Sequence, residues 1–97
     1  MSQTVQDKIA VVKLRVGGMH SAAVTTHGQV YTWGNNDEGA LGREGLEDKP
    51  LPVDLPVKFT DAAVGDSHSI FYNSNTNDVY FCGLYRVSNF VNLIPPF

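Results

Sequence analysis

The sequence predicts an all-β protein built from two copies of one small antiparallel sheet. A pattern of residues recurs after 48 or 49 positions, a spacing typical of architectures that repeat one supersecondary unit. Twelve valines, nine glycines and five prolines among the 97 residues favour strands joined by turns over helices. Since no segment shows helical periodicity, each copy is expected to contain four short strands, the content of one β-propeller blade.

The first copy accounts for four strands in order. Residues 13–16 form the first expected strand, which a Gly-Gly pair ends. Residues 21–25 form the second, and a His-Gly dipeptide then supplies a turn because glycine readily adopts positive φ. Residues 29–33 alternate polar and apolar side chains, as a half-buried strand does. The stretch around residues 50–55 carries two prolines, which suits an outer edge strand.

The second copy follows the first closely. Residues 16–21 are Val-Gly-Gly-Met-His-Ser, and residues 64–69 are Val-Gly-Asp-Ser-His-Ser. The turn and strand that follow in the first copy, residues 28–34, recur at 77–83. We therefore expect three parts: an N-terminal extension over residues 1–9, one blade over residues 10–56, and a second, incomplete blade over residues 57–97.

Composition argues against several classes of function. Seven basic residues against ten acidic ones give a net charge of −3, which argues against a basic nucleic-acid clamp or a binder of anionic membranes. The single cysteine cannot form an intramolecular disulfide, so a reducing compartment is expected. No apolar run reaches the ~18–20 residues of a membrane span, and residues 1–8 lack the apolar segment of a secretory signal.

The repeated residues resemble the regulator of chromosome condensation repeat family. The family pattern is Gly-x-x-His, then Gly-x-Val-Tyr-x-Trp-Gly, then Asn-x-x-Gly-x-Leu-Gly. The last element lies within residues 35–43, where Asp-Glu-Gly-Ala-Leu-Gly-Arg is similar to the Ran exchange factors of the family. The resemblance covers roughly residues 10–86 and implies a seven-bladed propeller. Because two repeats make at most two blades, the chain is expected to be a fragment.

The resemblance implies part of a guanine-nucleotide exchange factor for the small GTPase Ran. Such a factor docks on the GTPase and promotes nucleotide release by preferring the nucleotide-free form, with no covalent chemistry and no cofactor of its own. It implies a nuclear protein associated with chromatin (histones or DNA) through segments outside this chain. The alternative is a non-catalytic protein-interaction propeller of the same family. The isolated chain is expected to self-associate through its unpaired blade faces.

The resemblance also implies where the GTPase docks. Asp66 is expected to face the GTPase and promote exchange, with Ser67 and His68 beside it as further partner-binding residues. Loops of a propeller lie on its two faces, where partners bind. Tyr85 and Arg86 match the beginning of an inserted hairpin, a wedge that presses on the GTPase. This possible wedge is expected over residues 84–95, with a generic outer strand of the second blade as the alternative.

Structural alternatives stand beside these roles. Asp66 could instead cap a tight turn by accepting backbone N–H bonds. His20 and His68 occupy the same repeat position, which favours a structural role in satisfying backbone groups between strands. Trp33 and Cys82 are also repeat equivalents, so both are expected to point into the packing of their blades. Cys82 would then be an inert, buried thiol.

Three kinds of chemical site are not expected. The spacings of His20, His27, His68 and Cys82 match no metal-ligand pattern. The chain has no Gly-x-x-x-x-Gly-Lys-Ser/Thr loop, so it is not expected to hold a nucleotide itself. Because Ser67 and His68 are adjacent in sequence, they make a poor beginning for a catalytic triad.

Overall fold

The computed structural model describes residues 10–84, which form two antiparallel sheets. The first sheet has the order β1-β2-β3-β4, and the second has the order β5-β6-β7. No helix occurs within residues 10–84, and so none there could cross a membrane. The strands are β1 (Val11–Val16), β2 (His20–Thr25), β3 (Val30–Gly34), β4 (Leu51–Pro52), β5 (Asp61–Val64), β6 (His68–Tyr72) and β7 (Val79–Gly83).

The predicted strands of the first copy are all present; the first three lie within two residues of their expected bounds, and the fourth is shorter than the expected stretch around residues 50–55. Each strand pairs with its chain neighbour, and the last of them, β4, is reduced to two residues that pair with Tyr31 and Thr32. A proline in β4 cannot donate a ladder hydrogen bond, which suits the edge position. The second sheet has three strands within the described residues. A fourth strand would fall beyond residue 84, outside them.

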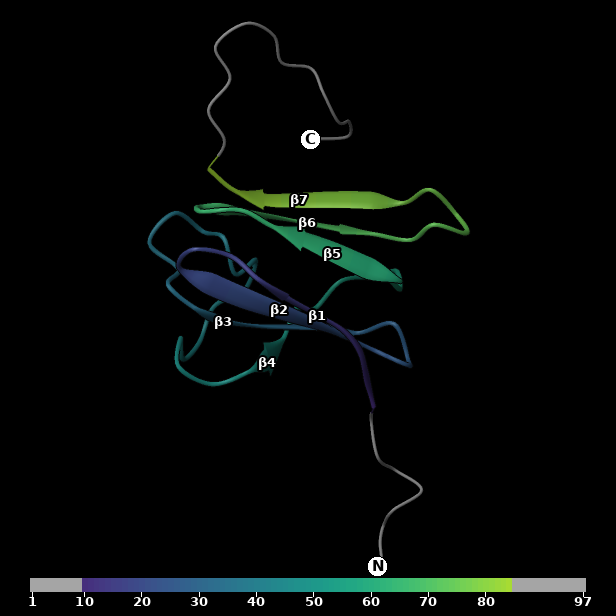
Figure 1. The fold of residues 1–97 in the computed structure, drawn as a ribbon, viewed down its shortest axis with the longest axis horizontal. Coiled ribbons are helices and arrows are strands. Elements are labelled where there is room, and N and C mark those ends of the chain that lie inside the picture. The colour runs from purple at the N-terminus through teal and green to yellow at the C-terminus, as the bar shows by residue number, and fades with distance from the viewer. Residues whose placement is uncertain (1–9, 85–97) are drawn as a thin grey trace, which may run out of the picture.

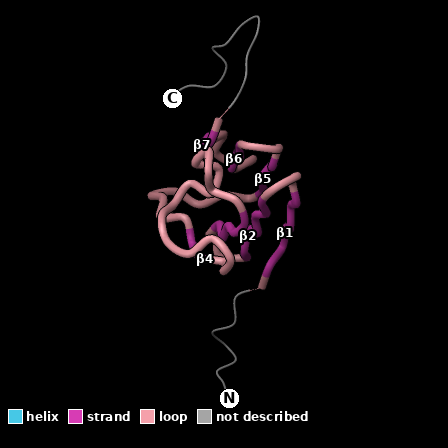
Figure 2. Tube along the Cα trace, turned by 90° about the vertical axis from the view of Figure 1, so that its left-hand side faces the viewer, coloured by secondary structure: helices cyan, strands magenta, loops and turns pink. Residues whose placement is uncertain are grey.

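The core lies between the two sheets, which stack face to face (Figures 1 and 2). To the apolar core the first sheet contributes Ala22, Val24 and Val30, and the second contributes Ala62 and Phe71. The segment that links the sheets adds Val53 and Phe59, and the rings of Phe59 and Phe71 meet edge to face with centroids 6.0 Å apart. Each sheet therefore buries one face against the other.

An ion pair also joins the two sheets, between β1 and β5. The Arg15 guanidinium donates two hydrogen bonds to the Asp61 carboxylate, at 3.0 Å and 2.9 Å. The hydroxyl of Tyr72 donates to the same carboxylate at 3.2 Å. These bonds, Arg15 foremost, hold the pKa of Asp61 below its usual value. The bidentate pairing of Arg15 with Asp61 fixes the lateral position of one sheet on the other.

The loop between β3 and β4 is anchored by its own side chains. The side chain of Asn36 accepts a bond from the Leu41 backbone N–H and donates to the carbonyl of Arg43. Leu41 is fully buried, and its carbonyl accepts a bond from the Thr32 hydroxyl at 2.8 Å. Arg43 in turn donates to the Thr32 carbonyl at 2.7 Å. The acidic segment that follows, residues 44–48, is exposed.

Trp33 does not lie between the two described sheets. Its repeat equivalent, Cys82, occupies the matching face of the second sheet, and that is the face that meets the first sheet. In β3, Val30 and Thr32 are buried on the same face as Val24 and Ala22 of β2, so alternation turns Tyr31 and Trp33 to the opposite face. There Trp33 is half-buried and lines an apolar groove with Leu14 and other residues of β1 and β2. This face has no sheet packed on it within residues 10–84.

Candidate functional site

Two equivalent loops lie against each other at one end of the stacked sheets. They join β1 to β2 (residues 17–19) and β5 to β6 (residues 65–67), and both turn at the same end in Figure 1. A side chain at Gly17 would run into the carbonyl oxygen of Gly65 and the side chain of Val64. A side chain at Gly18 would run into the carboxylate of Asp66. The first loop therefore has to lack side chains at positions 17 and 18 for the second loop to pack against it.

Asp66 is exposed at this end, and its carboxylate is uncommitted. Within residues 10–84 it makes no hydrogen bond and no ion pair. Asn35 and Asn73 behave differently, because the side-chain oxygen of each accepts a backbone N–H two residues ahead, at 2.9 Å and 2.8 Å. Those two residues form the side-chain turns that were the alternative for Asp66. The described contacts give Asp66 no such capping bond.

Ser67 and His68 accompany Asp66 in a cavity of about 410 Å³, which Leu84 completes. The carbonyl of Ser67 accepts the backbone N–H of Leu84 at 2.9 Å, just after β7 ends. The same bond occurs in the first sheet, where the carbonyl of Met19 accepts from Asn35 at 2.9 Å. Three of the five predicted site residues thus lie together. The other two, Tyr85 and Arg86, lie outside the described residues, as does almost all of the expected wedge.

The two repeated histidines have different surroundings. His20 is buried, and its Nε2 lies 2.7 Å from the hydroxyl of Ser69 across the sheet interface. That hydroxyl donates onward to the carbonyl of Ala40 at 2.8 Å, so it accepts from His20. Burial lowers the pKa of His20. His68 is half-buried, and its ring packs over Gly65 and stacks on Phe81 with centroids 5.8 Å apart.

His20 therefore has a structural role, as its repetition predicts. Its direct partner is the hydroxyl of Ser69 rather than a backbone group, and that hydroxyl passes the contact to the Ala40 backbone.

Cys82 packs against the core as expected, although it is half-buried rather than buried. Its sulfur lies 3.3 Å from the carbonyl of Ala40. Burial raises the pKa of Cys82 to about 11, so the thiol stays protonated and unreactive near neutral pH. No group of three or more histidine, cysteine or acidic side chains within residues 10–84 is placed to hold a metal ion.

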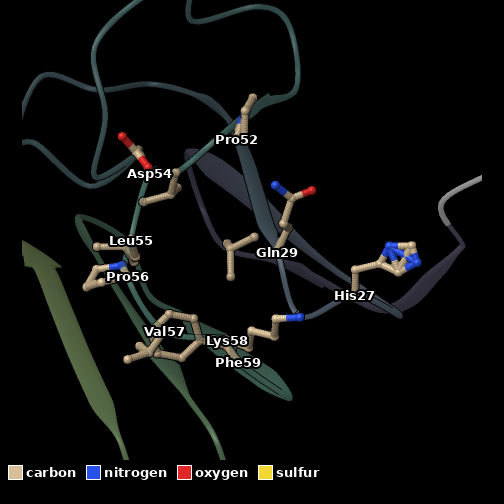
Figure 3. A pocket seen from close by; sticks show the side chains of 12 residues that line it. His27, Gln29, Pro52, Asp54, Leu55, Pro56, Val57, Lys58 and Phe59 are labelled. Atoms are coloured by element: carbon tan, nitrogen blue, oxygen red, sulfur yellow. The ribbon is translucent and has the colours of Figure 1, made fainter.

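A second cavity lies beneath the turn between β2 and β3, at the other end of the sheets from Asp66. It measures about 340 Å³ and is walled by that turn and by the segment that links β4 to β5 (Figure 3). Its walls are mostly proline, valine, leucine and phenylalanine, with Asp54 and Lys58 at the edge. Nothing in the sequence pattern pointed to it, because the linking segment has no counterpart in the family motifs.

Comparison with known proteins matches these repeats to one family. Two family models match, both described as "Regulator of chromosome condensation (RCC1) repeat", over residues 27–72 and residues 11–40. Together they cover most of the part of the chain described above. The chain belongs to the RCC1 repeat family.

Curated RCC1 proteins are similar to this chain over most of its length. The human regulator of chromosome condensation is 40% identical over 91 residues, which are 89% of this chain and 21% of the human protein. The Drosophila melanogaster protein of the same name is 48% identical over 62 residues, 60% of this chain and 11% of that protein. The chain thus spans about a fifth or less of the length of these relatives.

Solved structures share the fold of this chain. Prp20p from Saccharomyces cerevisiae, described with its binding to Gsp1p and histones, has a TM-score of 0.71 and 33% identity, over 81% of this chain and 20% of Prp20p. Human WBSCR16 has a TM-score of 0.63 and 34% identity, over 73% of this chain and 18% of its own. Since Prp20p, the yeast RCC1, is a β-propeller, the two sheets are two propeller blades.

Sequence reasoning missed Gly18 as a residue of this site. The signal was available: Gly18 and Asp66 are 48 residues apart and occupy the same repeat position. The contact of Asp66 with Gly18 depends on how the blades pack, and a repeat pattern alone does not show that packing.

Proposed function

We propose that this chain is part of a guanine-nucleotide exchange factor for the small GTPase Ran. The loop with Asp66, Ser67 and His68 docks on the GTPase, and Asp66 is the residue that promotes exchange. The proposal is supported by the identity to curated RCC1 proteins over most of the chain. It is also supported by the likeness to Prp20p, a protein described with its binding to Gsp1p, a Ran protein.

The mechanism is one of differential affinity. The propeller binds the nucleotide-free GTPase more tightly than the nucleotide-bound form, so docking lowers the barrier to nucleotide release. No bond is made or broken on the propeller, which acts as a regulator rather than as a chemical catalyst. In this proposal the wedge over residues 84–95, with Tyr85 and Arg86, completes the contact.

The same proposal covers location and the division of the chain. Since Prp20p is described with binding to histones, we assign the intact protein to nuclear chromatin, which it would contact through segments outside this chain. We retain the division into an extension over residues 1–9, a blade over residues 10–56 and a blade over residues 57–97.

The observation that carries the proposal is the uncommitted carboxylate of Asp66. A carboxylate that caps a turn accepts local N–H bonds, whereas a carboxylate that binds a partner is left available in the free protein. Within residues 10–84 Asp66 is of the second kind. It also lies in the loop that the family resemblance assigns to the GTPase.

Asp66→Ala in the intact protein tests this. We expect release of a fluorescent guanine nucleotide from Ran to slow by about tenfold, which corresponds to about 1.4 kcal/mol of barrier. Asp54→Ala is the matched control, because Asp54 is also exposed and uncommitted within the described residues but lies at the other cavity. Equal rates for the two variants, with a lower melting temperature for Asp66→Ala alone, would assign Asp66 to the fold instead.

A second candidate is a protein-interaction propeller without exchange activity. The human E3 ubiquitin-protein ligase HERC2 is 40% identical over 68 residues, 66% of this chain, so similar repeats occur in a protein with a different name and role. Under this candidate, the intact protein would leave nucleotide release from Ran at its spontaneous rate even when present in excess.

A further inference from the structure

Gly18 occupies, in the first repeat, the position that Asp66 occupies in the second. The two residues are 48 positions apart, and their loops lie against each other. A β-carbon at Gly18 would lie 2.6 Å from Oδ1 of Asp66, closer than non-bonded atoms approach. The absence of a side chain at Gly18 therefore creates the space in which the Asp66 carboxylate rests.

This glycine is not required by its backbone. Gly28, Gly34 and Gly83 have positive φ, but Gly18 does not, so an alanine there would not be strained. What an alanine would meet is the tip of the Asp66 side chain, which can rotate away. Gly17 is the contrasting case, since its β-carbon would meet the backbone of Gly65, which cannot move freely.

The surroundings of the carboxylate suit a cationic side chain. Within residues 10–84 no lysine or arginine pairs with Asp66, so its negative charge has no internal partner. Two apolar side chains are exposed at this end, Met19 beside Gly18 and Leu84 in the same cavity as Asp66. A lysine or arginine can bind the carboxylate with its head group while its methylene chain packs on such apolar surface.

We propose that Gly18 is a positioning residue. Because Gly18 has no side chain, the Asp66 carboxylate can occupy the place where a cationic side chain of the docked GTPase binds it. The inference rests on the proposed function for its partner, but the positioning of Asp66 is a property of this chain alone. It predicts that a small side chain at position 18 weakens binding through Asp66 and through no other route.

A double-mutant cycle in the intact protein tests the positioning. We expect Gly18→Ala to weaken binding to nucleotide-free Ran by about fivefold, or about 1 kcal/mol, with an unchanged melting temperature. In an Asp66→Ala background Gly18→Ala should have no further effect, whereas in the Asp54→Ala background it should keep its full effect. An equal effect in both backgrounds, or none in the unsubstituted protein, would overturn the proposal.

Two further measurements separate this inference from the proposed function. Asp66→Asn keeps the shape and removes the charge, so it should match Asp66→Ala in binding; retained binding would overturn the cationic partner. The side-chain carboxyl ¹³C resonance of Asp66 should shift on Gly18→Ala, with no GTPase present. If the intact protein does not act on Ran, the proposed function fails, and this resonance still decides whether Gly18 positions Asp66. An unmoved resonance overturns the positioning.

Discussion

His20 and His68 show which properties of a residue its repeat position predicts and which it does not. Both follow the same glycine-containing loop, yet only His20 is covered by a neighbouring sheet within the described residues, where it bonds to Ser69. Repetition correctly predicted a structural histidine at position 20. It could not predict the partner, because Ser69 is 49 residues away and enters the contact only through the stacking of the sheets.

The lowered pKa of His20 predicts an acid-sensitive fold. Its pKa in the folded chain lies below the value of about 6.5 expected when unfolded. As the pH falls below about 6.5, His20 becomes protonated in the unfolded chain before it does so in the folded chain. The free energy of unfolding therefore decreases as the pH falls. Urea unfolding between pH 7.5 and 5 should show this slope. His20→Gln should flatten it and cost roughly 1–2 kcal/mol at pH 7.5.

The control for this measurement is His27→Gln, since His27 is exposed in the turn between β2 and β3. It should keep the slope of the unsubstituted chain. Identical slopes for all three proteins would mean that His20 does not carry the acid sensitivity.

At the residue scale, the candidate site was only half predictable. The repeat pattern and family resemblance placed Asp66, Ser67 and His68 in one loop, and the structure brings them to one cavity. The facing residue, Gly18, could not be found from its own surroundings in sequence. Gly18 matters because it leaves room for the Asp66 carboxylate, and the two loops that form this space meet only when the blades stack.

The individual strands were the most predictable part of the molecule. Alternation and turn residues located β1, β2 and β3, because strand periodicity and glycine turns are local properties. The face to which Trp33 points was not predictable in this way. Alternation tells which residues share a face, but not which of the two faces meets the next sheet. The buried Val30 and Thr32 decide it for β3.

Two truncations compare the two faces. Phe71→Ala should destabilise the 97-residue chain by about 3–5 kcal/mol, because Phe71 is fully buried between the sheets. Trp33→Ala should cost only about 1–2 kcal/mol, because Trp33 is half-buried on the open face. Thermal unfolding at low protein concentration measures both. A loss for Trp33→Ala as large as that for Phe71→Ala would show that something covers the open face in solution.

At the scale of the whole molecule, the contacts between the two blades do not simply repeat. Arg15 in the ion pair has Ala63 as its counterpart 48 residues later, and Asp61 has Lys13 as its counterpart 48 residues earlier. The equivalent positions of the other repeat therefore do not supply the same pair. A repeat supplies the general apolar stacking of blades, while substitutions such as these distinguish one neighbour from another.

The open face of the first sheet leads to a last prediction, that the isolated 97-residue chain self-associates. Val11, Leu14 and Val16 on β1 are 57%, 55% and 71% exposed, and the groove beside Trp33 is apolar. Burial of such a surface against another copy is favourable. Light scattering after size exclusion should give a mass above 10.6 kDa that rises with concentration.

Charge substitutions locate the association on this face. Leu14→Lys places a charge in the groove and should lower the measured mass towards that of a monomer. Leu46→Lys is the control, because Leu46 is similarly exposed, at 57%, but lies in the loop between β3 and β4 and does not line the groove. It should leave the association intact. A constant mass near 10.6 kDa at all concentrations would contradict the prediction of self-association. An equal effect of the two lysine substitutions would show that the association does not use this face.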